Sequence, residues 1–510
     1  MPGVSMLWPD SAASSDRLMV DSGAVTDLHL DRIIAAIVGA DEYRLRAWFS
    51  EPVRGPETVR YRQEIFADLA DDSVREVFDA FAAGMRGTLE RLDWQERLHH
   101  PQQRQSWQLG AAAEYIEATA RFAEALAGLP LASRALTRWR GFLTDYVAGP
   151  DFGRLATAVH QVQRAVSSVR YSLRIVDRTL EVGPVGAEAD FSAAIAKLFS
   201  RFGVGAPRPG RPRSEWDDIN HMEEQILDRV AALHPRVFEQ LAEFARDHGQ
   251  FADAAVMAFD REIQFYLTYL AFVRRVSGTA RAMCLPQLAT RGAPMHAEGA
   301  FDLALVTRRG RVDTEVVCND LRLSGPERVL VVTGPNQGGK TTFARTVGQL
   351  IYFAALGCPV PARSACLPLT DRLFTHFERA ERATDPDGRL AEELLRIRDT
   401  LEEATADSVI ILNESFSATS TADAVRIGGD VLERIVERGA IAVWVTFFDE
   451  LARSGPATVS MVAATDPGDP SRRTFRIERR PADGHAHAVV LAERFGLTYD
   501  LVTARIAACG

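Results

Sequence analysis

Apolar residues in the first half of the chain recur with helical spacing. From about residue 28 to residue 288 they return at positions i, i+3, i+4 and i+7, as in Val74, Val77, Phe78 and Phe81. Many of these stretches are rich in alanine and arginine, and both residues favour helix. The pattern predicts a mainly helical core.

One part of this half does not fit a helix. Ser168–Ile175 alternates between apolar and polar residues, which is typical of a strand, and Leu180–Gly183 follows it. Arg201–Arg213 has the sequence RFGVGAPRPGRPR, and its glycines and prolines exclude a regular helix. That segment is either a flexible basic loop or a tip that contacts phosphate. The helical pattern resumes at Trp216.

Near residue 300 the pattern changes to short apolar strands that alternate with helices. Three continuous apolar runs end in polar or glycine-rich turns, and they are Val329–Val332, Val409–Leu412 and Ala440–Val445. Continuous apolar strands separated by helices predict a buried parallel sheet with crossover helices. The expected fold class is therefore multidomain, with a mainly α-helical core followed by an α/β domain.

A glycine-rich motif follows the first of these strands. Gly334–Thr341 has the sequence GPNQGGKT, which matches G-x-x-x-x-G-K-[ST], and a helix is predicted over Phe343–Leu356. Glycines in such a turn let backbone N–H groups surround phosphate oxygens, and the helix N-terminus adds positive potential. Lys340 suits the β- and γ-phosphates, and the hydroxyl of Thr341 suits Mg²⁺.

Composition strengthens this interpretation. The chain has 59 Lys and Arg against 69 Asp and Glu, a net charge of −10, and only two of its basic residues are lysines, Lys197 and Lys340. A sequence that uses arginine almost everywhere retains lysine at the position where a planar guanidinium would not fit. We therefore expect ATP and Mg²⁺ as cofactors. The residues expected to bind them are Gly334, Pro335, Asn336, Gln337, Gly338, Gly339, Lys340, Thr341 and Thr342.

The second apolar strand ends in Asn413 and Glu414, about 75 residues after the glycine-rich motif. A carboxylate at this place can orient the attacking water as a general base, so Glu414 is the candidate catalytic residue. Asn413 stands where an aspartate normally supports Mg²⁺. Its amide can bond a metal-bound water but lacks the charge. The third strand ends in Thr446, Phe447 and Phe448.

Other chemistry and targeting signals are weak. The five cysteines form no CxxC pair, so neither a disulfide framework nor a zinc site is expected. The first 25 residues do not have the pattern of a signal peptide, and no apolar run approaches the roughly 18 residues of a membrane helix. We expect a cytoplasmic protein without a membrane partner.

Several segments match motifs of one known ATPase family. They are Thr333–Thr342, Val360–Ala362, Asp371–Thr375, Glu414 with Thr419–Asp423, Asn319 with Asp320, and Ala492–Leu497. Together they cover about residues 316 to 506 and resemble the MutS family of DNA mismatch-repair ATPases, a branch of the ABC-type ATPases. A weaker resemblance to the start of that family's helical core lies in Leu45–Arg54 and Arg62–Ile65.

The resemblance implies a domain order and a set of partners. Residues 1–25 would be an N-terminal tail and residues 26–295 the helical core, with a possible reduced clamp near 165–215. Residues 296–510 would be the ATPase domain, with a short helical C-terminal end. The mismatch-reading and connector domains of the family would not fit before the core. By the same resemblance, Asn319 would bind the cofactor, and Ser420 and Asp423 would face the partner in a homodimer on double-stranded or branched DNA.

Three positions depart from the family. Asn413 replaces its Mg²⁺-linked aspartate, Phe447 stands where it has a histidine, and Arg389–Glu393 lacks the hydroxyls of its signature element. All three bear on the γ-phosphate, so binding is expected to survive better than turnover, and hydrolysis is expected to be slow or absent. The run Glu378–Arg389 is either a solvated loop or an altered partner-facing signature.

Two main functions remain open. The first is a dimeric, nucleotide-controlled DNA clamp that does not read mismatches. The second is a switch or scaffold for a protein partner, with no turnover and no role on DNA. Another ABC-type ATPase is a third reading, and the motif set at Thr419–Asp423 argues against it.

Overall fold

The structure is a computed structural model that describes residues 4–9, 17–177, 179–185, 221–278, 281–290, 293–307, 316–378, 388–417, 419–466, 468–469, 472–482 and 503. These residues form helices and several sheets, which confirms the mixed α/β class. By contacts the chain divides into two compact units. Unit 1 comprises Met1–Asp71, Ala132–Leu136 and Arg261–Gly510, and unit 2 comprises Asp72–Leu131 and Thr137–Asp260.

This division does not follow the order of the chain. The first 71 residues cluster with the last half, although a boundary near residue 295 was expected from the sequence. The segment 1–25, expected to be a tail, contributes β1 (Met19–Val20) to a sheet, and its Met6 and Leu7 are buried. The boundaries at 26–295 and 296–510 therefore stay a prediction based on family resemblance.

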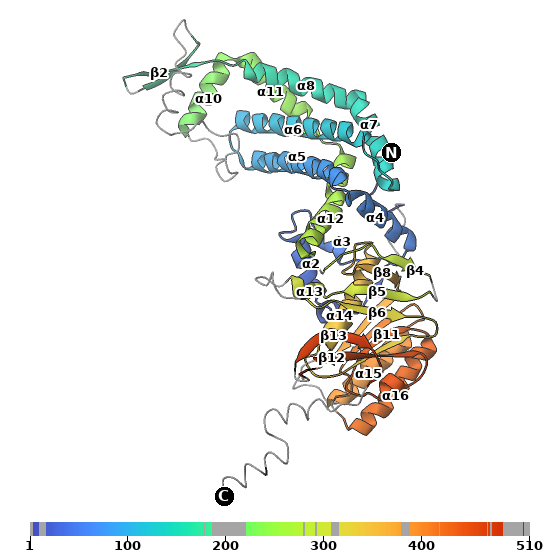
Figure 1. Ribbon diagram of the computed structural model, residues 1–510. Coiled ribbons are helices and arrows are strands. Elements are labelled where there is room, and N and C mark those ends of the chain that lie inside the picture. Colours follow the sequence, from blue (N-terminus) through green and yellow to red (C-terminus); the bar gives the residue numbers. More distant parts are fainter. Residues whose placement is uncertain are drawn as a thin grey trace. The chain divides into compact units, whose positions relative to one another are not determined.

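Unit 2 is helical, as the apolar spacing predicts. Its helices are α5 (Asp72–Arg97), α6 (Pro101–Ala127), most of α7 (Arg134–Ala148), α8 (Pro150–Ser167), α10 (His221–Leu233), α11 (Pro235–Asp247) and the start of α12 (Ala254–Val276). Figure 1 shows α5, α6, α8 and α11 side by side. Aromatic rings fill the core: Trp139 stacks on Phe259 with centroids 4.0 Å apart, and Phe81 stacks on Phe122 at 4.3 Å.

A hairpin interrupts the helices of unit 2. It consists of β2 (Ser172–Val176) and β3 (Thr179–Gly183), which pair antiparallel. The strand predicted from Ser168 begins later, because α8 continues to Ser167. The basic segment Arg201–Arg213 lies outside the described residues.

Unit 1 begins with short helices that pack against segments far along the chain. They are α1 (Ala24–Asp27), α2 (Leu30–Val38), α3 (Arg46–Phe49) and α4 (Pro56–Leu69). Arg62 of α4 is buried and donates hydrogen bonds to the carbonyls of Leu7 and Leu356, at 3.1 and 3.2 Å. Burial lowers the pKa of this guanidinium. A buried charge must have such partners to be tolerated, so Arg62 ties three distant segments together.

The main sheet of unit 1 has the strand order β1-β9-β10-β11-β7-β12-β13. The bounds are Arg372–Phe377 for β9, Val409–Asn413 for β10, Ile441–Val445 for β11, Val329–Thr333 for β7, Thr458–Thr465 for β12 and Arg473–Arg479 for β13. All pairs are parallel except β12 with β13. The structure thus confirms the parallel sheet predicted from three apolar runs, which are β7, β10 and β11.

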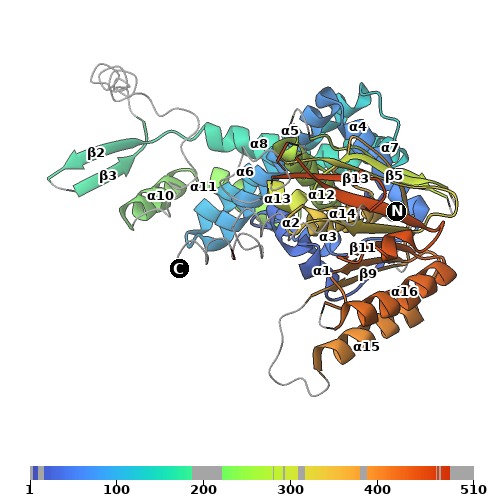
Figure 2. The same ribbon diagram turned by 60° about the horizontal axis from the view of Figure 1, so that its bottom comes forward.

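Helices cover both faces of this sheet. Figure 2 shows α15 (Gly388–Glu403) and α16 (Thr421–Arg438) together on one face, and α14 (Lys340–Ala355) packs on the other face against β10 and β11. Short turns complete the unit at α13 (Leu303–Val306) and at the 3₁₀ turn Leu451–Arg453. Because both faces are covered, β7 and β10 are buried throughout.

A smaller sheet lies beside the main one in unit 1. Its order is β4-β8-β5-β6, with bounds Gln287–Ala289, Ser364–Pro368, Met295–Ala300 and Asn319–Leu323.

Four cysteines are free thiols, as expected, and Cys509 lies outside the described residues. Within the described part of the chain, no helix has both the length and the apolar character that crossing a membrane requires.

Candidate functional site

The candidate residues gather where four parallel strands end. The register pairs Val332 of β7 with Val445 of β11, Val445 with Asn413 of β10, and Asn413 with Phe377 of β9. The segments that follow these strands therefore leave the sheet at the same edge. In parallel α/β sheets, ligands bind at the carboxyl ends of the strands.

The glycine-rich loop joins β7 to α14 through a tight turn. Gly334 and Gly339 have φ angles of 115° and 92°, and Gln337 has a φ of 59°. A Cβ at Gly334 would lie 3.0 Å from the backbone nitrogen of Ala463, so both conformation and space require glycine there. Helix α14 begins at Lys340, three residues before the predicted start, which brings its N-terminus directly to the loop.

Lys340 is held inside this loop. Its side chain is buried, with 4% of the residue exposed. Nζ donates to the carbonyl oxygens of Gly334 at 2.8 Å and Pro335 at 3.2 Å. Burial lowers the pKa of Lys340 to about 8, while the Glu414 carboxylate opposes this shift and Arg473 adds to it.

Thr341 and Asn413 meet although 72 residues separate them. The Thr341 hydroxyl donates to Oδ1 of Asn413 at 2.9 Å, and Asn413 is 8% exposed. A hydroxyl and an amide oxygen are ligands that suit Mg²⁺, which keeps several waters and takes its remaining ligands from phosphates. No cluster of three or more His, Cys, Asp or Glu suited to a metal occurs among the described residues.

Glu414 follows Asn413 in an unusual backbone conformation. Its φ of 58° is left-handed, and its N–H donates to the carbonyl of Val445 at 2.8 Å. Such a conformation is costly for a residue with a Cβ and is often found at functional sites. Its carboxylate favours the charged form of Lys340, so the predicted catalytic residue lies in the field of the predicted phosphate ligand.

The other predicted residues have structural contacts. Asn319 joins β6 to β13, since its Nδ2 donates to the carbonyl of Phe475 at 3.1 Å and its Oδ1 accepts from the N–H of Ile477 at 2.7 Å. Its cofactor role stays a prediction. Ser420 caps α16, because its hydroxyl accepts from the N–H of Asp423 and donates to that carboxylate at 2.7 Å. A partner-facing role for this pair stays a prediction too.

Sequence reasoning did not anticipate several contacts at this edge. Arg473 donates from Nε to the carbonyl of Asn336, 3.2 Å away. The ring of Phe447 lies over Nζ of Lys340, with its centroid 4.6 Å away. His376 bonds to Glu393 at 3.1 Å, and the same carboxylate oxygen accepts from the N–H of Phe416 at 3.0 Å. The one sequence signal for the pair of His376 and Glu393 is that Glu393 lies in Arg389–Glu393, the segment noted above for its lack of hydroxyls.

Polar contacts farther along α14 also hold this helix in place. The buried Asp302 carboxylate accepts from Gln349 at 2.7 Å and pairs with Arg345 at 3.0 Å. Gln349 and Arg345 in turn donate to the carbonyls of Leu28 and Asp27. This network links the helix that begins with Lys340 to segments more than 300 residues away, so it restrains the position of the loop.

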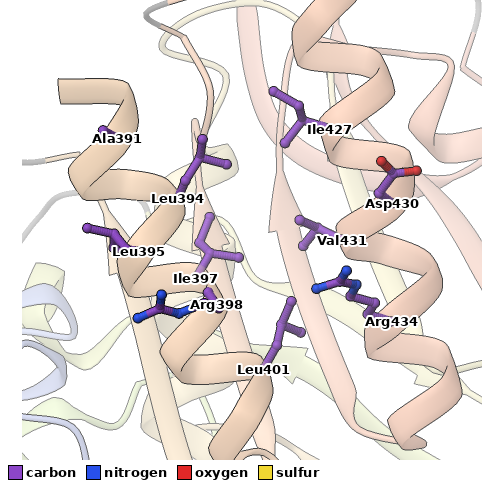
Figure 3. Close-up of a pocket in the computed structure, with 10 residues that line it drawn as sticks. All are labelled: Ala391, Leu394, Leu395, Ile397, Arg398, Leu401, Ile427, Asp430, Val431 and Arg434. Atoms are coloured by element: carbon purple, nitrogen blue, oxygen red, sulfur yellow. The ribbon is translucent and has the colours of Figure 1, made fainter. Parts of the chain in front are cut away.

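An apolar groove lies apart from these residues. Figure 3 shows Leu394, Ile397 and Leu401 of α15 pointing toward Ile427 and Val431 of α16. Arg398, Asp430 and Arg434 also line this groove. None of the candidate site residues lines it.

Comparison with known proteins agrees with this geometry. Residues 330–467 match the family model described as MutS domain V. This part of the chain is a MutS domain V. The match includes all of β7 except Val329, and all of β10 and β11. It also includes Lys340, Asn413, Glu414 and Phe447, whereas Asn319 and Arg473 lie outside it.

The similarity to MutS proteins is local. DNA mismatch repair protein MutS of Shouchella clausii (strain KSM-K16) is 37% identical over 136 residues, which are 26% of this chain and 16% of that protein. MutS of Thermotoga maritima is 34% identical over 141 residues, or 28% of this chain and 18% of that protein. MutS of Chlorobium phaeovibrioides is 28% identical over 234 residues, or 45% of this chain and 26% of that protein. The chain thus matches only a minor part of each relative.

Proposed function

We propose that the chain is a dimeric, ATP-binding MutS-family protein that acts as a nucleotide-controlled DNA clamp, with slow or impaired ATP hydrolysis. The observation that carries the proposal is the meeting of Lys340, the Thr341–Asn413 pair and Glu414 at one edge of the sheet. The loop and the N-terminus of α14 would hold the phosphates, Thr341 and Asn413 would bind Mg²⁺ and its waters, and Glu414 would orient a water.

The slow hydrolysis in this proposal follows from the missing negative charge at Asn413. Bound Mg²⁺ would neutralise the phosphates and polarise the γ-phosphoryl group, and a carboxylate beside it normally fixes its waters. The neutral amide of Asn413 provides only a hydrogen bond to that position. A nucleotide would therefore be held longer than it is cleaved, which suits a clamp whose state is set by binding.

Unit 2 offers a surface for the DNA backbone. Tyr171 and Leu173 are 44% and 49% exposed at the β2–β3 hairpin, and Arg170 and Arg174 beside them are exposed as well. Arginine and tyrosine side chains commonly contact phosphate and sugar, which fixes position without reading sequence. We propose that this hairpin is the reduced clamp and that Ser420 and Asp423 face the partner protomer.

The affinity for ADP is expected to fall as the pH rises above about 8. The ammonium of Lys340 has a pKa of about 8 without ligand, and a phosphate beside it favours the charged form and raises that pKa. Binding is therefore unaffected by this group well below pH 8 and must take up a proton above it. Titration of ADP between pH 7.5 and 9.5 measures this, and Lys340→Ala should remove the dependence. A flat wild-type profile would contradict it.

DNA binding is expected to weaken steeply with salt and to be equal for mismatched and fully paired duplexes. Each phosphate contact contributes a slope of about −0.9 to log K against log [salt]. Fluorescence anisotropy with labelled duplex measures the slope, and replacing Arg170 and Arg174 together by alanine should make it less steep by about 2 units for each bound protomer.

The control for this experiment is Arg154→Ala. Arg154 is an exposed arginine near the start of α8, about 20 Å along the helix from its end at Ser167. It should leave the slope unchanged. Equal wild-type binding at low and high salt would reject the clamp and leave the second candidate, a nucleotide-dependent dimerising switch for a protein partner. The neutral Asn413 and the ring of Phe447 beside Lys340 are the observations that favour that candidate.

A further inference from the structure

Phe447 makes an unexpected contact at the candidate site. It follows β11, whose last four residues are buried, yet its own side chain is 45% exposed. The exposed ring faces the ammonium of Lys340, with its centroid 4.6 Å from Nζ. A cation within about 6 Å of an aromatic face is attracted by the negative charge of that face.

The ammonium has its partners inside the chain. Two bonds go to the carbonyl oxygens of Gly334 and Pro335, at 2.8 and 3.2 Å, and the ring covers a further side. These contacts replace water around a largely buried charge. A phosphate that binds Lys340 must therefore compete with contacts that already exist.

The spacing leaves no room for a phosphate oxygen between the ring and the ammonium. Such an oxygen would lie about 2.8 Å from Nζ, and it needs about 3.5 Å from the carbon atoms of the ring. The 4.6 Å between centroid and Nζ is too short for both. The ring must move before an oxygen can occupy that side.

We infer that Phe447 is a latch on Lys340 that makes the site favour a nucleoside diphosphate over a triphosphate. The inference rests on the proposed nucleotide site. The β-phosphate would lie inside the loop, held by its backbone N–H groups and reached by Nζ from the side of Gly334 and Pro335, and this does not require the ring to move. A γ-phosphate would extend toward the strand ends, where the ring offers no donor and presents a negative face to an anion.

The ring acts through the lysine, so Phe447 is a positioning residue. Moving the Phe447 ring away from Lys340 breaks the cation–π contact, which lowers the affinity for a triphosphate by about 2- to 30-fold. Phe447→Leu keeps an apolar side chain but removes the aromatic face, and Phe447→Tyr keeps the face. Phe475→Leu is the matched control, because Phe475 is similarly exposed, at 50%, and its backbone lies close to Gly339.

The test is calorimetric titration of the full chain with ADP and with the non-hydrolysable β,γ-imido analogue of ATP, both with Mg²⁺. Wild type should bind ADP more tightly. Phe447→Leu should raise affinity for the analogue by about 2- to 30-fold and leave ADP affinity within about twofold. Phe447→Tyr and Phe475→Leu should behave as wild type. Thermal melting of each variant checks that it is folded.

The possible failures are distinguishable. Equal changes in both affinities for Phe447→Leu, or no change in either, would overturn the latch while nucleotide binding stands. A wild type that prefers the analogue would also overturn it. Absence of binding by either nucleotide, or binding by Lys340→Ala that equals wild type, would overturn the nucleotide site and the latch with it.

Discussion

Lys340→Ala is expected to weaken nucleotide binding by about 100-fold. Lys340 is the only lysine in the part of the chain that the structure describes, and its amine is buried where its charge meets little water. Removing one partner of a desolvated charge pair costs about 3 kcal/mol, or about 100-fold in Kd. Titration with ADP and Mg²⁺ measures the loss, with melting curves to show that the variant remains folded.

Lys340→Arg is the matched control for charge. A guanidinium is planar and larger than an ammonium. It therefore cannot take the place that Nζ occupies beside the carbonyls of Gly334 and Pro335. We expect it to restore little of the affinity. If alanine at this position left the affinity within about threefold of wild type, the nucleotide would have to bind elsewhere and the proposed site would be wrong.

Asn413→Asp is expected to raise the steady-state rate of ATP hydrolysis by about 10- to 100-fold. The Thr341 hydroxyl already points at Oδ1 of Asn413 from 2.9 Å, so a carboxylate of the same shape can accept the same bond. It would add the negative charge that orders metal-bound water, and one preorganised group of this kind changes rates by about 10²-fold. Phosphate release assays with and without a Mg²⁺ chelator measure the gain.

Two variants separate charge from packing. Asn413→Ala removes the partner of Thr341 and should not raise the rate. Glu414→Gln in the Asn413→Asp background should abolish the gain if Glu414 orients the water. A wild type that already hydrolyses as fast as Asn413→Asp would show that the neutral amide does not limit turnover.

Much of the main sheet could be predicted because its central strands are continuous apolar runs between polar turns. β7, β10 and β11 have this pattern, and their predicted bounds differ from the observed ones by one residue at most. β1 could not be predicted, since two residues carry no periodicity. The division into units could not be predicted either, because a contact between distant residues such as Arg62 and Leu356 leaves no pattern in the local sequence.

The candidate site shows the same contrast. The proximity of Thr341 and Asn413 could be predicted from the sequence. The glycine-rich motif places Thr341 after one strand, Asn413 ends another, and parallel strands of a sheet end at the same edge. The contact between Phe447 and Lys340 could not, since it depends on the direction of one ring. The pair of His376 and Glu393 could not either, because neither residue belongs to a motif that requires the other.

The discontinuous make-up of unit 1 has a consequence for synthesis of the protein. Met19 of β1 pairs with Arg372 of β9. Leu28 and Phe49, both fully buried, pack in a unit whose remainder, apart from Ala132–Leu136, begins at Arg261. A ribosome adding about 5–20 residues per second needs roughly 20 to 70 seconds between Met19 and Arg372. Unit 2 is complete by then. The N-terminal helices must wait, with their apolar surfaces uncovered, until the strand that receives them has emerged.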